Sequence, residues 1–109
     1  MKFSVIIPAF NEEKTILKLL ERLNETKVEN IEYEFIVIND GSTDDTKNLL
    51  ENNKNLFSTL INNNKNLGKG YSVREGLKIA KGEFVGNLMQ MLLLDLDLTL
   101  VNTRDHTVY

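Results

Sequence analysis

Residues 33–50, YEFIVINDGSTDDTKNLL, combine a strand, a turn and the start of a helix, and this order decides the fold class. The largely apolar run 33–38 has the length of a buried strand, and the Asn-Asp-Gly-Ser sequence that follows ends it. Ser42 or Thr43 can cap a helix that carries two aspartates in its first turn, where carboxylates interact favourably with the helix dipole. A buried strand followed directly by a helix is the repeating unit of an α/β domain.

The same alternation of strand and helix patterns continues on both sides of this segment. Further strands are predicted at residues 3–7, where Pro8 ends the run, at 56–61, at 84–85 and at 88–94, and helices at 12–24 and along the apolar stripe of Val73, Leu77 and Ala80, which Gly82 ends. Apolar strands separated by helices indicate a parallel sheet that helices cover on both faces. Ligands bind such sheets at the carboxyl ends of the strands, so the polar residues that follow the strands are the candidate site.

The composition indicates a small globular domain, or a part of a larger one, and excludes several classes of protein. Of the 109 residues, 41% are hydrophobic and 27% are charged, and the net charge is −3. The chain has no cysteine, which excludes disulfides, thiolate metal sites and cysteine nucleophiles. The lone histidine, His106, cannot form a histidine metal site by itself. Lys and Arg form no basic stripe, so we expect no nucleic-acid partner.

No membrane span is predicted. The N-terminal apolar run is too short for a signal peptide. The longest apolar region, residues 85–101, is interrupted by the polar residues Asn87, Gln90, Asp95 and Asp97. We therefore expect a cytoplasmic protein.

Two acidic residues follow predicted strands and have two interpretations each. Asp40 is either a turn residue that bonds its own backbone or an acceptor for the N–H groups of a nucleobase at the strand end. Glu12 either favours the N-terminus of a helix electrostatically or contacts a ligand. The residues alone leave both alternatives open.

The segment 66–72, NLGKGYS, places Lys69 and Gly70 directly before a predicted helix. It departs from the Walker phosphate loop, because Gly70 stands where that motif requires Ser or Thr. Backbone amides at a helix start can still bind an anion. The segment is therefore either a phosphate-binding loop or a plain connection.

Asp95 and Asp97 stand at the end of an apolar run, in the segment LLLDLDLTLVNT (92–103). Alternate residues of a strand point to the same side, so both carboxylates can coordinate one divalent cation. Two like charges this close are costly to bury without a cation or a shared proton. The alternative is a strand end exposed to solvent.

Three segments resemble, in order and at ordinary spacing, successive motifs of the family 2 glycosyltransferases, and most closely those of the polyprenyl-phosphate sugar transferases. They are SVIIPAFNEEKTI (4–16), EFIVINDGSTDDT (34–46) and NNKNLGKGYSVREGLKIAKGEFV (63–85). The resemblance covers residues 3–85 and implies a Rossmann-like, GT-A nucleotide-binding half. The residues that it implies for a UDP- or GDP-linked sugar are Pro8, Phe10 and Glu12 lining the nucleotide pocket, Ile38 packing there, and Asp40 contacting the base.

The resemblance also implies a metal cofactor and an acceptor. In the family an Asp-x-Asp motif holds Mg²⁺ or Mn²⁺ on the diphosphate, and Asp95 and Asp97 would take that role. The polyprenyl-phosphate branch implies a lipid-phosphate acceptor. The family's acceptor-binding half and catalytic base lie beyond Tyr109, so we assign no catalytic residue and expect a truncated half that is incomplete as an enzyme. An incomplete sheet leaves an edge uncovered, so we expect self-association.

The tail of the chain has a second resemblance. Residues 86–91, GNLMQM, interrupt the family spacing, either as an insertion or as the junction of two genes at Met91. The segment MLLLDLDLTLVNT (91–103) is similar to the first motif of the haloacid dehalogenase phosphatases, in which Asp95 would be the nucleophile and Asp97 the general acid/base. We therefore divide the chain into a nucleotide-binding half-domain, 1–85, and an Asp-x-Asp tail, 86–109. Three functions stay open: sugar-nucleotide binding for transfer, a phosphatase fragment, and an inactive remnant.

Overall fold

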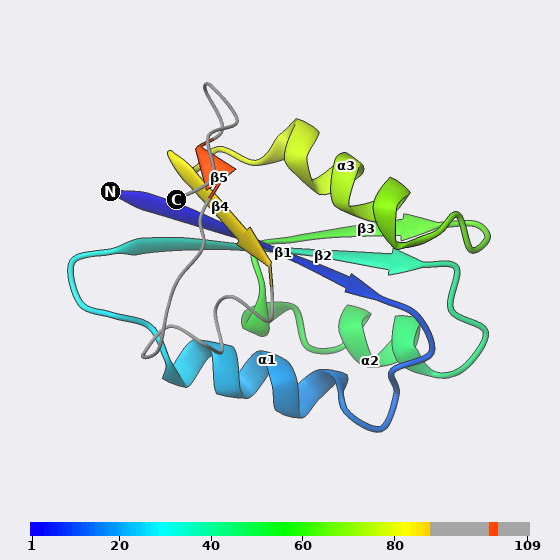
Figure 1. The fold of residues 1–109 in the computed structure, drawn as a ribbon. Helices are drawn as coiled ribbons and strands as arrows, with labels where there is room; N and C mark the ends of the chain where they lie inside the picture. The colour runs from blue at the N-terminus through cyan, green and yellow to red at the C-terminus, as the bar shows by residue number, and fades with distance from the viewer. Residues whose placement is uncertain (88–100, 103–109) are drawn as a thin grey trace.

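The computed structural model describes residues 1–87 and 101–102 of the chain (Figure 1). Its strands are β1 (Lys2–Ala9), β2 (Glu32–Asp40), β3 (Thr59–Asn63), β4 (Phe84–Asn87) and β5 (Val101–Asn102). They form one sheet in the order β3-β2-β1-β4-β5, in which β1 to β4 run parallel and β5 is antiparallel to β4. The predicted strand at 88–94 and the residues Asp95, Asp97 and His106 lie outside the described residues.

Helices cover both faces of the sheet. The helices are α1 (Ile16–Glu25), α2 (Thr46–Glu51), the 3₁₀ turn η1 (Lys54–Leu56) and α3 (Lys69–Ile79). α1 and α2 lie on one face and α3 lies on the other (Figure 1). The predicted α/β fold, with a parallel sheet between two layers of helices, is confirmed. Within the described part of the chain, no helix has the length and apolarity needed to cross a membrane.

The two faces of the central strands form two apolar cores, because successive side chains of a strand point to opposite sides. The larger core joins Val5 and Ile7 of β1 to Leu20 of α1. The smaller core joins Ile6 of β1 to Ile38 of β2 and packs against α3. Burying each of these side chains is worth roughly 1.5–3 kcal/mol. The cores therefore hold the carboxyl ends of β1 and β2 in fixed positions.

β1 continues through Pro8, where the sequence predicts that it ends. Proline has no N–H to donate to a neighbouring strand. In β1, the backbone N–H and C=O groups of the even-numbered residues point towards β4, as the hydrogen bond from the Glu83 N–H to Lys2 O shows. The nitrogen of Pro8 therefore also points towards β4. Among the described residues, the pairing of β1 with β4 ends at Ile6. The missing N–H therefore removes no hydrogen bond between the described strands.

The predicted caps of the second helix, Ser42 and Thr43, are wrong. Asp45 is the N-cap residue of α2, and Oδ1 of Asp44 accepts a hydrogen bond of 2.9 Å from the Thr46 N–H. Ser42 and Thr43 instead bond the loop that follows β1. This long-range contact moves the start of the helix towards the C-terminus.

Two further elements, α1 and β3, begin later than predicted. α1 begins at Ile16 rather than at residue 12, because the preceding residues form a turn in which the Ile16 N–H donates to Glu12 O at 2.8 Å. The third strand begins at Thr59 rather than at residue 56, because Leu56 closes the η1 turn by donating its N–H to Asn53 O at 3.1 Å. In both places a local turn occupies the first predicted residues, so the helix or strand begins later in the sequence.

Candidate functional site

A pocket of about 400 Å³ opens at the carboxyl ends of β1 and β2, and we call it the strand-end pocket. It is formed by the end of β1 with its loop, the end of β2, and the loop that leads into α3. The lining residues are Pro8, Ala9, Phe10, Glu12, Asp40, Asn66, Gly68 and Lys69. The fold thus brings together Pro8, Phe10, Glu12, Asp40 and Lys69, all predicted site residues from distant parts of the sequence.

Two other predicted site residues lie outside this lining. Ile38 is fully buried in the core that packs against α3, two positions before Asp40. Ile38 therefore belongs to the core beneath the pocket. Gly70 is exposed as the second residue of α3.

Asp40 is buried at the end of β2 and keeps only 3% of its surface exposed. One carboxylate oxygen accepts hydrogen bonds from the Asn63 side chain at 3.0 Å and the Leu67 N–H at 2.8 Å, and the other accepts one from the Gly68 N–H at 2.9 Å. Burial by itself raises the pKa of this carboxyl, but these bonds and the Ser72 hydroxyl outweigh it and hold the pKa of Asp40 below its ordinary value. The Ser72 hydroxyl is buried near this carboxylate, although its geometry satisfies no hydrogen bond among the described residues.

The loop after β1 is bonded to the loop after β2. Asn11 lies in the left-handed region with a φ of 51°, which asparagine tolerates better than most residues. Its side-chain oxygen accepts hydrogen bonds from the N–H groups of Thr43 at 2.8 Å and Asp44 at 3.3 Å. The Glu12 N–H donates to Oγ1 of Thr46 at 2.9 Å. These bonds fix the backbone that carries the pocket residues at the end of β1.

Asp44, in the loop after β2, also bonds the loop after β1. Its carboxylate accepts hydrogen bonds from the Thr46 N–H at 2.9 Å and from the Glu13 N–H at 3.3 Å. Desolvation raises the pKa of Asp44, but the hydrogen bonds outweigh it and the pKa lies below the ordinary value. The ionised Asp44 therefore ties the two loops together through hydrogen bonds to both of them.

The groups around the pocket suit a ligand that has a flat ring and an anionic part. Pro8 offers apolar surface, and the ring of Phe10, which is 43% exposed, offers an aromatic face. Asp40 and Glu12 supply carboxylate acceptors, and Lys69 supplies a cation. A concave apolar surface with a few convergent polar groups is the usual form of a small-molecule site.

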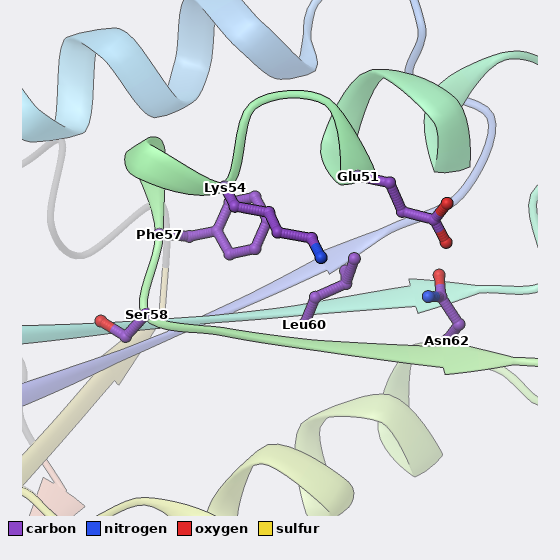
Figure 2. Close-up of a pocket in the computed structure, with 6 residues that line it drawn as sticks. All are labelled: Glu51, Lys54, Phe57, Ser58, Leu60 and Asn62. Atoms are coloured by element: carbon purple, nitrogen blue, oxygen red, sulfur yellow. The ribbon is translucent and has the colours of Figure 1, made fainter.

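A second pocket, of about 360 Å³, lies between the edge strand β3 and the helices above it (Figure 2). Its lining residues are Glu51, Lys54, Phe57, Ser58, Leu60 and Asn62. They come from α2, η1, β3 and the connection between η1 and β3, and the set contains none of the predicted site residues. The strand-end pocket is therefore the candidate functional site.

No group of three or more His, Cys, Asp or Glu side chains within residues 1–87 and 101–102 could hold a metal ion. The predicted ligands, Asp95 and Asp97, fall outside these ranges. Their coordination of a metal stays a prediction.

The sequence patterns do not single out Asn66, which lines the pocket, or Asn11 and Asn63, which hydrogen-bond the segments around it. Asn11 and Asn63 bond partners 32 and 23 residues away, so no local pattern reveals them. The abundance of asparagine in the loops was the one signal in the sequence.

Comparison with known proteins gives a family and a fold. The family model described as Glycosyl transferase family 2 matches residues 4–100. Dolichyl-phosphate beta-glucosyltransferase ALG5A of Trichomonas vaginalis is 38% identical over 104 residues, which cover 86% of this chain and 30% of that relative. Staphylococcus aureus TarS in complex with UDP aligns with a TM-score of 0.70 at 38% identity, over 80% of this chain and 26% of its own. The mannosyltransferase PcManGT of Pyrobaculum calidifontis, in complex with GDP-Man and Mn²⁺, aligns with a TM-score of 0.66 at 27% identity, over 79% of this chain and 27% of its own.

The sheet order, the helices on both faces and these structural neighbours define an α/β domain of the GT-A glycosyltransferase class. Since the family model matches most of the sequence, the chain belongs to glycosyl transferase family 2. It spans less than a third of the length of each of the three proteins compared. The matched range extends beyond Asp95 and Asp97.

Proposed function

We propose that this chain is the sugar-nucleotide-binding half of a glycosyltransferase, and that the strand-end pocket holds the nucleotide of a UDP- or GDP-linked sugar. The observation that carries the proposal is the convergence of an exposed aromatic ring, two carboxylates and a lysine at the carboxyl ends of parallel strands. TarS in complex with UDP and PcManGT in complex with GDP-Man support a nucleoside diphosphate as the ligand class.

Each pocket residue then has a role that its chemistry suits. The base packs against Phe10 and Pro8. An ionised carboxylate has about four lone-pair positions, and hydrogen bonds from the protein use three of those on Asp40, which leaves room for an N–H of the base. Glu12 accepts a hydrogen bond from a ribose hydroxyl, and Lys69 contacts a phosphate.

We also propose that Asp95 and Asp97 hold Mg²⁺ or Mn²⁺. A divalent metal, when bound, neutralises charge on the leaving nucleoside diphosphate. The family match through residue 100 supports Asp95 and Asp97 as part of the same domain, and PcManGT is in complex with Mn²⁺. The same match supports an insertion at residues 86–91 over a junction of two genes, with 1–85 as the nucleotide-binding half-domain and 86–109 as the Asp-x-Asp tail.

The acceptor in this proposal is a lipid phosphate such as polyprenyl phosphate. Support comes from the Trichomonas vaginalis relative, which is named a dolichyl-phosphate glucosyltransferase. We assign no catalytic base to this chain. A cytoplasmic location and self-association through an uncovered sheet edge belong to the same proposal.

Isothermal titration of UDP and GDP, with and without Mn²⁺, tests nucleotide binding. We expect one nucleotide to bind, Mn²⁺ to strengthen the binding, and Lys69→Ala to weaken it about five- to tenfold through the loss of a charge-assisted phosphate contact. Lys65→Ala is the matched control, because Lys65 is an exposed lysine of the loop that precedes α3 and lies outside the pocket lining. Equal affinities for the two alanine variants would overturn the assignment of Lys69.

The two other functions predict different results. A haloacid dehalogenase-like phosphatase fragment would hydrolyse a generic phosphomonoester, and Asp95→Asn would abolish the hydrolysis. An inactive remnant would fold but bind neither nucleotide and hydrolyse nothing. Metal-enhanced nucleotide binding without hydrolysis of the phosphomonoester is the result that our proposal predicts.

A further inference from the structure

The loop between β3 and α3, residues 64–68, forms one wall of the strand-end pocket through Asn66 and Gly68. Its hydrogen bonds lead back to the end of β2. The N–H groups of Leu67 and Gly68 donate to the Asp40 carboxylate at 2.8 and 2.9 Å. The Asn66 side chain donates to the backbone oxygen of Asp40 at 3.4 Å. A single residue, Asp40, therefore anchors three consecutive residues of the wall.

Gly41, the next residue after Asp40, fits against the same loop. A Cβ at this position would come within 2.2 Å of the Lys65 carbonyl carbon and 2.4 Å of the Asn66 nitrogen. The φ of Gly41 is 70°, which strains any residue with a side chain. The loop backbone thus packs on the glycine in a way that no other residue allows.

Asn63 holds the Asp40 carboxylate in position. Its side-chain N–H₂ donates to Oδ1 of Asp40, the same oxygen that accepts the Leu67 N–H. Asn63 is the last residue of β3 and pairs with Asp40 in the sheet register. Its donation orients the buried carboxylate and offsets part of the cost of removing the charge from water. Asn63 itself lies outside the pocket lining.

We propose that Asn63 and Gly41 are positioning residues of the nucleotide site, which hold Asp40 and the loop 64–68 as the pocket wall without touching the ligand. The inference rests on the proposed function, because its ligand is the nucleotide. It predicts that substitutions at residues that the nucleotide does not contact loosen the loop 64–68 and weaken nucleotide binding.

Asn63→Asp tests this role against Asn62→Asp. Asn63 acts as a donor, so an isosteric carboxylate loses the hydrogen bond and places a second negative charge against Asp40. Asn62 acts as an acceptor for the Asn39 side chain, so the same substitution keeps its hydrogen bond. Asn63→Gln keeps an amide donor and serves as the rescue variant.

Two measurements apply to each variant: amide hydrogen exchange at Leu67 and Gly68 by NMR, and titration with UDP and GDP. In Asn63→Asp we expect exchange at both amides to become about tenfold faster or more, and nucleotide affinity to fall about tenfold or more. Exchange of Ile36 in the buried strand β2 should stay unchanged, and Asn62→Asp should match the wild type. Asn63→Gln should recover part of both effects, which a general loss of packing would not produce.

The outcomes separate this inference from the proposed function. If wild type binds a nucleotide while Asn63→Asp leaves exchange and affinity unchanged, the inference is overturned and the proposed function stands. If wild type binds neither nucleotide, the proposed function fails and the inference fails with it. Should Asn63→Asp not fold, Asn63→Ala removes the donor without adding charge, and unchanged exchange at Leu67 and Gly68 in that variant overturns the inference.

Discussion

Replacing Gly82 by alanine should disrupt the turn between α3 and β4. A Cβ at this position would lie 2.6 Å from Oγ and 2.7 Å from the backbone nitrogen of Ser4, and 3.0 Å from the oxygen of Lys2. Both neighbours belong to the central strand β1, which is paired on both sides and cannot shift at low cost. The turn itself therefore has to move away from the sheet.

The size of the effect follows from the hydrogen bonds that this movement breaks. They are Gly82 N–H to Ser4 Oγ at 2.9 Å, Lys81 N–H to Glu34 Oε1 at 2.9 Å and Glu83 N–H to Lys2 O at 3.0 Å. A neutral hydrogen bond contributes about 1 kcal/mol net, and one to a charged group about 1.5–3 kcal/mol. The substitution should lower the free energy of unfolding by about 3–5 kcal/mol, a large part of the roughly 5–15 kcal/mol typical of a domain.

Urea unfolding followed by circular dichroism measures this loss, and Gly70→Ala is the matched control. A Cβ at Gly70 would meet only Nη1 of Arg74, at an ordinary 3.5 Å. Alanine inside a helix is favoured over glycine by about 0.5–1 kcal/mol, so this variant should be slightly more stable than the wild type. If Gly82→Ala unfolds at the same urea concentration as the wild type, the close packing of the turn on β1 is refuted.

Four further predictions test the fold and the site. The pKa of Asp40 lies below its ordinary value in the folded protein, so its contribution to stability is complete above about pH 4 and is lost as the pH falls through the folded pKa. Urea unfolding between pH 6 and 2 should therefore show that the free energy of unfolding falls more steeply with acid in the wild type than in Asp40→Asn. Glu34→Ala should cost about 2–4 kcal/mol in the same assay, because it leaves the buried Ser4 hydroxyl and the partly buried Lys81 N–H without their acceptor, and a loss below about 1 kcal/mol would contradict this. Asp95→Asn with Asp97→Asn should remove the effect of Mn²⁺ on nucleotide titration while metal-free binding persists, and a retained metal effect would place the ligands elsewhere. The outer strand β3 should support self-association, so light scattering should give a mass that rises with concentration; a constant monomer mass would speak against it.

The order of strands and helices could be predicted from the sequence because it depends on local patterns. The apolar runs of β1 and β2 are visible without the structure, and so is the fact that Glu12 and Asp40 follow them. Parallel strands bring their carboxyl ends to one edge, which is why residues 28 positions apart were expected in one pocket and line it together.

The parts that could not be predicted depend on contacts between distant segments. Pro8 is tolerated inside its strand because, among the described residues, no strand pairs with β1 at this position on the side of its nitrogen, and this depends on the sheet rather than on the proline. The start of α2 is set by bonds from the loop after β1. Asp40 could be read as a turn residue or as a ligand contact, and the structure adds a third role, that of an anchor for the loop before α3.

Mapping a bound nucleotide by ¹H–¹⁵N chemical shifts tests the central claim most directly. Titration with UDP or GDP should shift the amides of the strand-end pocket, those of Phe10, Glu12, Asp40, Gly68 and Lys69. The amides of Glu51, Lys54 and Leu60 around the second pocket (Figure 2) should stay in place. Shifts confined to that second pocket, or no shifts in a folded protein, would contradict nucleotide binding at the ends of β1 and β2.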